Sequence, residues 1–444
     1  MKKLEGRAFL CLTLAMMLVI GLCIFVYKLA VNGDDWASFY ANQHVYDGGK
    51  LTTGAVYDRT GLRLMKNDEQ GSHYIDDKEL RKAVFHVVGD KGLNVKTGAN
   101  YAFRKELVGY SFITGTNDTL MEKNRRVTLT IDSEVNRTAY KALAGRNGFV
   151  SVYNWKTGDI VCMVSGPSAD PADSGDSNPE TGTYINKVLS AAYAPGSTFK
   201  LVTTAAAIEE MEGLNEWSFN CTGAHEIGGE KITCPAAHGK MDFYDALAKS
   251  CNCAYADITV ELGGKVMDRY VDKLGLTSSY DIDGIKTASG SFNFDTYDIN
   301  LGWAGIGQFE DQVNPLSMMV YMGAIAGEGS AAKPRLTIDR SFLGKEKESV
   351  RAIKLLSEGT ARQLKDMMRN NVFTTYGEEN YKGLELHAKS GTAETARGKT
   401  PDSWFCGFSG DYAFVVCIEE GGYGAVTAGP AAASVLRKIN EGIE

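Results

Sequence analysis

Positive charge is in short supply in this chain, and so is cysteine. Of 444 residues, 47 are lysine or arginine and 55 are aspartate or glutamate, so the formal net charge is −8. Such an acidic balance repels phosphate backbones, which argues against nucleic acid as a partner. Nine cysteines are too few for a disulfide scaffold, so the chain must fold by burying apolar surface.

The sequence also lacks internal repeats and low-complexity segments. Its hydrophobic residues (44%) and charged residues (23%) are close to globular averages, which excludes a disordered or fibrous protein. The length of 444 residues predicts roughly two or three domains.

Only one long apolar run is present, and it covers residues 8–27. It is long enough to cross the hydrocarbon core as a helix, at roughly 1.5 Å per residue. Basic residues precede it, so the positive-inside bias predicts a cytoplasmic N-terminus and an extracytoplasmic remainder. A cleaved signal peptide would be shorter and end in a small-x-small site. We therefore expect a cytoplasmic tip and an uncleaved single-pass anchor over residues 1–31, followed by a polar linker over 32–47.

Two modules follow in the hydrophobic pattern. The first, over residues 48–145, contains predicted strands near 54–61 and 126–132 and a helix over 133–143. The second, over 146–444, opens with a hairpin, has helices in the middle and ends with strands, which predicts an α+β domain whose sheet is closed by both chain ends. Its predicted elements are a hairpin over 149–164, helices over 200–211, 243–262, 313–327 and 354–372, and strands over 384–389, 403–407 and 412–418.

A candidate nucleophile, Ser197, stands in the segment Ala194-Pro-Gly-Ser-Thr-Phe-Lys200. Pro195 and Gly196 interrupt regular structure, so Ser197 falls at a helix start, with Lys200 three residues later on the same face. Burial and the positive helix end lower the pKa of such a lysine, which can then act as a base toward the serine. Free backbone N–H groups at the helix start can stabilise an oxyanion.

Two further motifs supply polar groups for acyl transfer. In Ser250-Cys-Asn252, Ser250 would relay a proton and Asn252 would hold a substrate amide, although a helix cap is the simpler interpretation of an isolated tripeptide. In Lys389-Ser-Gly-Thr392, a cation beside small residues on an edge strand suits docking of a substrate carboxylate, and Gly391 allows close approach of the backbone.

Each motif has further copies in the chain. The copies are Ser330-Ala-Ala-Lys333, Ser291-Phe-Asn293, Lys96-Thr-Gly98 and Lys156-Thr-Gly158. The first lies in a glycine-rich stretch before Pro334, and we interpret it as a solvated loop. The last is the predicted turn of the hairpin. Order, spacing and context together therefore favour the set at 197, 250 and 389.

In order and spacing, these motifs resemble those of the penicillin-binding proteins and serine β-lactamases. Over nearly the whole chain, the match resembles a class B penicillin-binding protein. Segments 54–61 and 126–132 resemble the start and close of that family's membrane-proximal, dimerisation-type pedestal, and Ile306-Gly-Gln308 and Ser403-Trp-Phe405 resemble segments beside its later motifs. Ser390 stands where the family usually has threonine, and Phe309 where it usually has glycine. No glycosyltransferase module matches, so we expect a monofunctional enzyme.

The resemblance implies a transpeptidase domain with a central antiparallel sheet flanked by helices. It also implies a peptidoglycan D,D-transpeptidase that cross-links stem peptides ending in D-alanyl-D-alanine, needs no cofactor and is trapped by β-lactam antibiotics. A membrane-embedded glycosyltransferase of the SEDS type is the implied protein partner. The alternatives are a D,D-carboxypeptidase or a β-lactamase on the same fold, and a non-catalytic penicillin sensor or scaffold.

The resemblance assigns a role to each motif residue. Ser197 would be the nucleophile, Lys200 its base and Ser250 a proton relay, while the backbone N–H groups of Ser197 and Thr392 would form the oxyanion hole. The substrate-binding residues would be Asn252, Lys389, Ser390, Gly391 and Thr392.

The cysteines leave one alternative open. Cys221 and Cys234 could form a disulfide outside the cell, but Cys221-x3-His225 and Cys234-x3-His238 also resemble a zinc site. The intervals match no zinc knuckle or ribbon, so we expect no metal and interpret the pair as a disulfide or two thiols. Cys251 and Cys253 are interpreted as small core residues.

Overall fold

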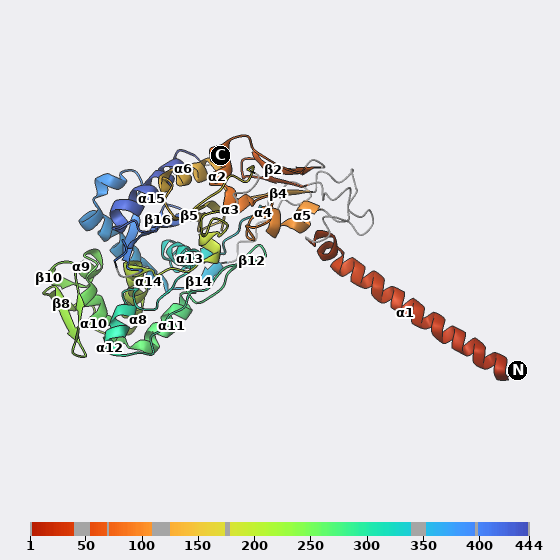
Figure 1. The fold of residues 1–444 in the computed structure, drawn as a ribbon. Coiled ribbons are helices and arrows are strands. Elements are labelled where there is room, and N and C mark those ends of the chain that lie inside the picture. Colours follow the sequence, from red (N-terminus) through yellow and green to blue (C-terminus); the bar gives the residue numbers. More distant parts are fainter. Residues whose placement is uncertain are drawn as a thin grey trace.

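A long N-terminal helix leads to two packed modules in the computed structural model (Figure 1). The structure describes residues 2–39, 54–68, 71–108, 125–173, 178–338, 352–395 and 398–442.

Helix α1 (Lys2–Ser38) contains the apolar run and is long and apolar enough to cross a membrane. It continues beyond residue 31 and so includes the first part of the expected linker. The reason lies at its end, where Ala37 is buried and Asp35 forms an ion pair with Lys105 of the first module. The linker from residue 40 onward lies outside the described residues.

The first module is built on a four-stranded sheet in the order β3-β2-β1-β4. Strand β1 runs parallel to β4, so the two segments predicted as strands at opposite ends of this module lie side by side. Its elements are β1 (Ala55–Tyr57), β2 (Arg63–Asp68), β3 (Gly71–Tyr74), α2 (Lys78–Ala83), α3 (Phe85–Val88), α4 (Ala99–Ala102), α5 (Arg104–Val108) and β4 (Arg126–Thr128).

A five-stranded antiparallel sheet, in the order β15-β16-β17-β5-β6, forms the centre of the second module. The N-terminal hairpin pairs with the last strand, so the predicted closure by both chain ends is confirmed. The strands are β5 (Gly148–Asn154), β6 (Ile160–Gly166), β15 (His387–Ala393), β16 (Asp402–Ser409) and β17 (Tyr412–Ile418).

Strand alternation divides the core of this module into two layers. On β5, Phe149 and Tyr153 belong to one buried cluster, while Val150 and Val152 belong to the other. Helices α6 (Ser133–Leu143) and α15 (Gly424–Asn440) cover one face of the sheet, and α13 (Pro315–Ala326) packs on the opposite face. Helix α6 was assigned to the first module, yet it packs on the sheet of the second.

The middle of the chain forms the helical layer beyond α13 and a small lobe of short strands (Figure 1, green). In this lobe, β7 pairs with β10 and β8 pairs with β9. The lobe strands are β7 (Ser218–Cys221), β8 (Ala224–Ile227), β9 (Glu230–Thr233) and β10 (Gly239–Asp242). The other elements are α7 (Lys187–Ser190), the 3₁₀ turn η4 (Gly196–Thr198), α8 (Lys200–Glu210), α9 (Phe243–Ala248), α10 (Asn252–Leu262), α11 (Gly264–Lys273), β11 (Asp281–Ile282), β12 (Ile285–Lys286), α12 (Asp298–Ala304), β13 (Ser330–Ala332), β14 (Ala352–Lys354), α14 (Glu358–Asn371), η5 (Val372–Tyr376) and η6 (Glu378–Tyr381).

Candidate active site

Ser197 lies on the 3₁₀ turn η4, immediately before helix α8, as its sequence context predicts. Gly196 has a φ of +53°, and a Cβ there would lie 2.8 Å from the carbonyl oxygen of Thr392. Glycine is therefore required for the turn to pack against strand β15. This close packing brings the candidate nucleophile beside the Lys389–Thr392 motif.

The Lys200 amine is fully buried and makes four hydrogen bonds. Its Nζ lies 3.1 Å from Ser197 Oγ and 3.2 Å from Ser250 Oγ, and it donates to Ser250 O and to Asn252 Oδ1, both at 2.7 Å. Burial lowers the pKa of Lys200 to about 8. A lysine with this pKa is neutral often enough near physiological pH to accept a proton from the adjacent serine.

Ser250 stands at a break between two helices, where the sequence predicted one continuous helix over residues 243–262. Helix α9 ends at Ala248, Ser250 adopts a φ of +51°, and α10 begins at Asn252 with Cys251 as its N-cap. The break frees the Ser250 carbonyl from helical hydrogen bonding, and Lys200 Nζ donates to it instead. A non-glycine residue held at positive φ is uncommon and frequently occurs at functional sites.

Asn252 uses both ends of its amide side chain. Its Oδ1 accepts from Lys200 Nζ at 2.7 Å, and its Nδ2 donates to the carbonyl oxygen of Thr233 at 3.0 Å. An amide nitrogen carries two hydrogens, so this single bond leaves a second donor for another group. The first α10 residue thus connects the buried lysine to the lobe.

The Lys389–Thr392 motif lies within β15, at the edge of the sheet. The predicted strand over 384–389 starts before β15 does, at Leu384 instead of His387. Leu384 and Leu386 are buried although they precede the strand, and their apolar character was interpreted as part of it. Lys389 is fully buried, and its Nζ donates to Ser250 Oγ at 3.0 Å and to Ser390 O at 2.9 Å. Burial, and then the neighbouring Lys200, hold the pKa of Lys389 well below its usual value.

Gly391 allows the close backbone approach that its position in the motif predicts. A Cβ at Gly391 would lie 2.9 Å from Thr198 Cγ2 and 3.0 Å from the carbonyl oxygen of Pro195. Ser390 and Thr392 flank it on β15 with half-buried side chains. The backbone N–H of Ser390 donates to the hydroxyl of Tyr376 at 2.8 Å, a support that sequence patterns did not indicate.

The structure therefore brings the three motifs together. The hydroxyl of Ser250 lies within hydrogen-bond reach of both buried lysines, and Lys200 also contacts the candidate nucleophile. The competing copies lie elsewhere. Ser330 begins strand β13, which corrects the interpretation of that segment as a solvated loop, because two residues of the strand are buried. Lys156–Gly158 forms the turn of the β5–β6 hairpin, as expected.

The family model for the penicillin-binding protein transpeptidase domain matches residues 148–441. The chain belongs to this transpeptidase family. Peptidoglycan D,D-transpeptidase PbpA of Mycolicibacterium smegmatis is 25% identical over 379 residues, covering 74% of this chain and 75% of that protein. Stage V sporulation protein D of Bacillus subtilis is 26% identical over 287 residues, covering 61% of this chain but only 44% of that protein.

Solved structures show the same fold. Penicillin-binding protein A of Mycobacterium tuberculosis, determined as a ceftriaxone acyl-enzyme complex, superimposes with a TM-score of 0.75 at 20% sequence identity. The match covers 87% of this chain and 97% of that one. The predicted α+β transpeptidase fold, with a central antiparallel sheet, is thereby confirmed.

Phe309, where the family usually has glycine, lies in a loop that contacts the turn of Ser197. Phe309 adopts a φ of +67°, a conformation that glycine accepts without steric cost. Two residues earlier, the carbonyl oxygen of Gly307 accepts a hydrogen bond from the N–H of Gly196 at 2.9 Å, so this loop supports the turn that carries Ser197.

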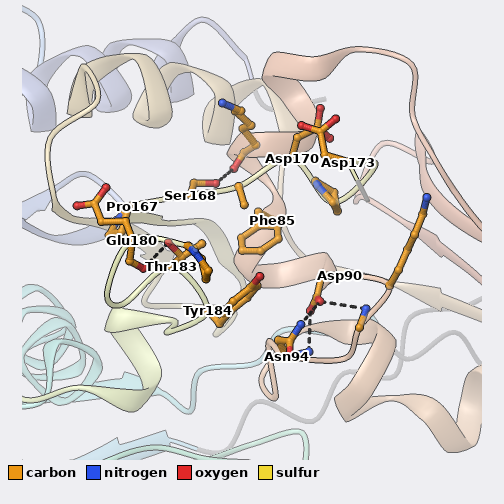
Figure 2. Close-up of a pocket in the computed structure, with 16 residues that line it drawn as sticks. Phe85, Asp90, Asn94, Pro167, Ser168, Asp170, Asp173, Glu180, Thr183 and Tyr184 are labelled. Carbon is orange, nitrogen blue, oxygen red and sulfur yellow. Dashed lines mark hydrogen bonds between the residues drawn. The ribbon is translucent and has the colours of Figure 1, made fainter. Parts of the chain in front are cut away.

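A pocket of about 520 Å³ lies away from these motifs, between the first module and the loop after β6 (Figure 2). Phe85 and Asp90 of the first module line it, together with Asp170, Thr183 and Tyr184 of the segment after β6. Among its described lining residues, none comes from the three motifs. The candidate active site is therefore located by the side-chain contacts of the three motifs and not by this pocket.

Proposed function

We propose that the chain is a peptidoglycan D,D-transpeptidase that cross-links stem peptides ending in D-alanyl-D-alanine through a Ser197 acyl-enzyme. The observation that carries this proposal is the buried amine of Lys200, 3.1 Å from the Ser197 hydroxyl and with its pKa lowered to about 8. A neutral amine at that distance is a base for a serine nucleophile that has no histidine partner.

In acylation, Ser197 Oγ attacks the carbonyl carbon of the penultimate D-alanine, and Lys200 Nζ takes the hydroxyl proton. Backbone N–H groups of Ser197 and Thr392 stabilise the oxyanion of the tetrahedral intermediate. The carbon–nitrogen bond then breaks, Ser250 passes a proton to the leaving amine, and D-alanine departs. The close packing of Gly196 against the carbonyl of Thr392 supports this assignment, because it brings the turn of Ser197 beside Thr392.

In the second half of the reaction, an amine of a neighbouring stem peptide attacks the ester carbon. The ester bond to Ser197 breaks, the serine oxygen regains a proton, and a new amide bond joins the two peptides. Lys389, with Ser390 and Thr392 beside it on β15, binds the terminal carboxylate, Gly391 permits its close approach, and Asn252 holds the peptide amide. A β-lactam occupies the same place and leaves a slowly hydrolysed ester on Ser197.

We further propose that α1 is a single-pass membrane anchor with its N-terminus in the cytoplasm and the catalytic domain outside. Basic residues before the apolar run support this orientation. Peptidoglycan synthesis takes place on that side of the membrane, where a membrane-embedded glycosyltransferase of the SEDS type would supply the glycan strands.

Labelling with a fluorescent penicillin tests the nucleophile. The detergent-solubilised full chain should form a stable label, Ser330→Ala should label equally, and Ser197→Ala should not label. Label that forms and vanishes with antibiotic turnover would indicate a β-lactamase, and no label on the folded wild type would refute the acyl-enzyme.

Product analysis tests the reaction. With a D-alanyl-D-alanine stem peptide and an acceptor amine, we expect release of D-alanine and a cross-linked dimer. Release of D-alanine with only the shortened peptide would identify a carboxypeptidase instead. Ser197→Ala should give neither product.

A further inference from the structure

Four side chains from separate segments of the lobe gather beside the Ser250–Asn252 turn. They are Cys221 at the end of β7, Cys234 after β9, His238 before β10, and Cys251 at the start of α10. The three sulfurs and one ring nitrogen all lie within 4.8 Å of one another. The sequence pattern suggested only part of this set, because Cys251 is separated from the others by helix α9.

The spacing of these atoms fits a tetrahedral zinc ion. With zinc–sulfur bonds of about 2.3 Å, two sulfurs on one ion lie about 3.8 Å apart. The Cys234 and Cys251 sulfurs are 3.6 Å apart, and the whole set lies within 4.8 Å. Three cysteines and one histidine are a ligand set that structural zinc sites use.

His238 gives an independent indication of a missing ligand. Its Nδ1 is buried and has no hydrogen-bond partner among the described residues. A buried polar nitrogen without a partner is costly, and coordination to a metal would satisfy it. His225, the other histidine of the lobe, is instead paired with Asp257 at 3.0 Å and lies outside the set.

The surroundings of Cys234 suit a metal-bound thiolate. The backbone N–H groups of Asn252 and Cys253 donate to its sulfur at 3.2 Å and 3.4 Å. Donors of this kind orient and stabilise sulfur ligands in metal sites. The Cys253 sulfur lies 3.5 Å from that of Cys234 but is outside the set of four, so it supports the site without completing it.

The lobe has only a small apolar cluster of its own, while Phe219 and Met241 pack against the main core. Its own apolar cluster consists of Ile227, Ile232 and Ala256, with a few partly buried neighbours. All nine cysteines are free thiols in the structure, so of the two interpretations of Cys221 and Cys234, a disulfide or two thiols, it has the two thiols. A small unit with so small a core commonly needs a metal or a disulfide for stability.

We propose that Cys221, Cys234, Cys251 and His238 bind one zinc ion that fixes the lobe to the turn carrying Ser250 and Asn252. This replaces our expectation from sequence that the chain has no metal site. The ion holds Cys251 between Ser250 and Asn252, both of which contact Lys200. Its role is structural, because all four positions are taken by protein ligands.

Elemental analysis of the purified full chain in detergent tests this proposal without reference to catalysis. We expect about one zinc per wild-type chain. The matched pair is His238→Ala, which should lose zinc at least about tenfold, and His225→Ala, which should retain it. Cys221→Ser should likewise lose zinc, and Cys253→Ser should retain it.

A spectroscopic measurement covers the case in which ligand variants fail to fold. Wild-type chain stripped of metal under reducing conditions and given Co²⁺ should show thiolate–cobalt charge-transfer bands and the visible absorption of a tetrahedral site. Absence of zinc and of this spectrum, or equal zinc in the two histidine variants, would overturn the proposal. So would a Cys234 disulfide in non-reduced peptides of freshly purified wild type.

Discussion

Acylation by a penicillin should depend steeply on pH, because Lys200 can accept the Ser197 proton only as a neutral amine. Burial lowers the pKa of Lys200 from 10.5 to about 8. At pH 7, about a tenth of the chains then hold a neutral Lys200, compared with about three in ten thousand for an unshifted lysine. Burial thus raises the neutral fraction about 300-fold.

The assay is the second-order rate of labelling by a fluorescent penicillin between about pH 6 and pH 9. The rate should rise about tenfold per unit below pH 7 and level off above about pH 8, where Lys200 is largely neutral. Ser330→Ala should reproduce the wild-type profile. A flat profile on protein that remains folded at each pH would refute the role of Lys200 as the base.

The same shift has a consequence for stability, and its sign can be worked out. Between about pH 8 and the ordinary value of 10.5, the unfolded chain binds more protons at Lys200 than the folded chain does. The free energy of unfolding therefore gains a contribution that rises with pH across this window. Lys200→Met should remove that contribution, which urea unfolding of the two proteins at several pH values would measure.

Three further perturbations test the packing around the site and between the modules. Ser250→Gly and Ser250→Ala should slow acylation equally, since both lack the hydroxyl. Urea unfolding should find the glycine variant more stable than the alanine variant by about 0.5–1 kcal/mol, because residue 250 has a φ of +51°. Equal stabilities of the two variants would contradict backbone strain at Ser250. Gly391→Ala should slow penicillin labelling, because its methyl group would lie 2.9 Å from Thr198. The control Gly359→Ala should label at the wild-type rate, because its methyl group would meet no neighbouring atom within 4 Å. Equal labelling rates of the two variants would show that β15 can shift to accept the methyl group. Burial lowers the pKa of His86 from 6.5 to about 4, so the unfolded chain binds more protons between these values and stability falls as pH drops through the window. His86→Gln should flatten that part of a thermal-unfolding pH series, and an unchanged slope would exclude His86 as its source.

Local patterns predicted most of the central sheet and two of the helices that pack on it, α6 and α13, but not α15. The short apolar runs of β5 and β17 are a local signal, and they are nearly continuous because each strand is buried on both faces by different clusters. Helix α15 was not predicted, since Gly429 and Pro430 interrupt its pattern. Gly429 is there for packing: a Cβ would lie 2.5 Å from the Tyr381 hydroxyl. That requirement comes from a contact distant in sequence.

The candidate site likewise has a part that local sequence predicts and a part that depends on contacts distant in sequence. Ser197 and Lys200 are three residues apart, so helical geometry alone predicts their contact. The break at Ser250 depends on Lys200, fifty residues away in sequence. Lys200 Nζ donates a hydrogen bond to the Ser250 carbonyl, which in a continuous helix would accept one from a backbone N–H. The cysteine set was missed for a similar reason, because its fourth member follows a separate helix and spacing rules treat ligands as neighbours in sequence.

The turn at Ser250 is held by restraints that come from three directions. Lys200 and Lys389 contact its hydroxyl from the helical layer and from the sheet edge, and the sulfur of Cys251, the N-cap of α10, lies beside that of Cys234. A residue at positive φ persists only where its surroundings over-determine it. The strain at Ser250, about 1–2 kcal/mol for a left-handed residue, is therefore offset by contacts that belong to the site itself. Loosening the lobe should release this turn first, so damage there would slow acylation before it unfolds the five-stranded sheet.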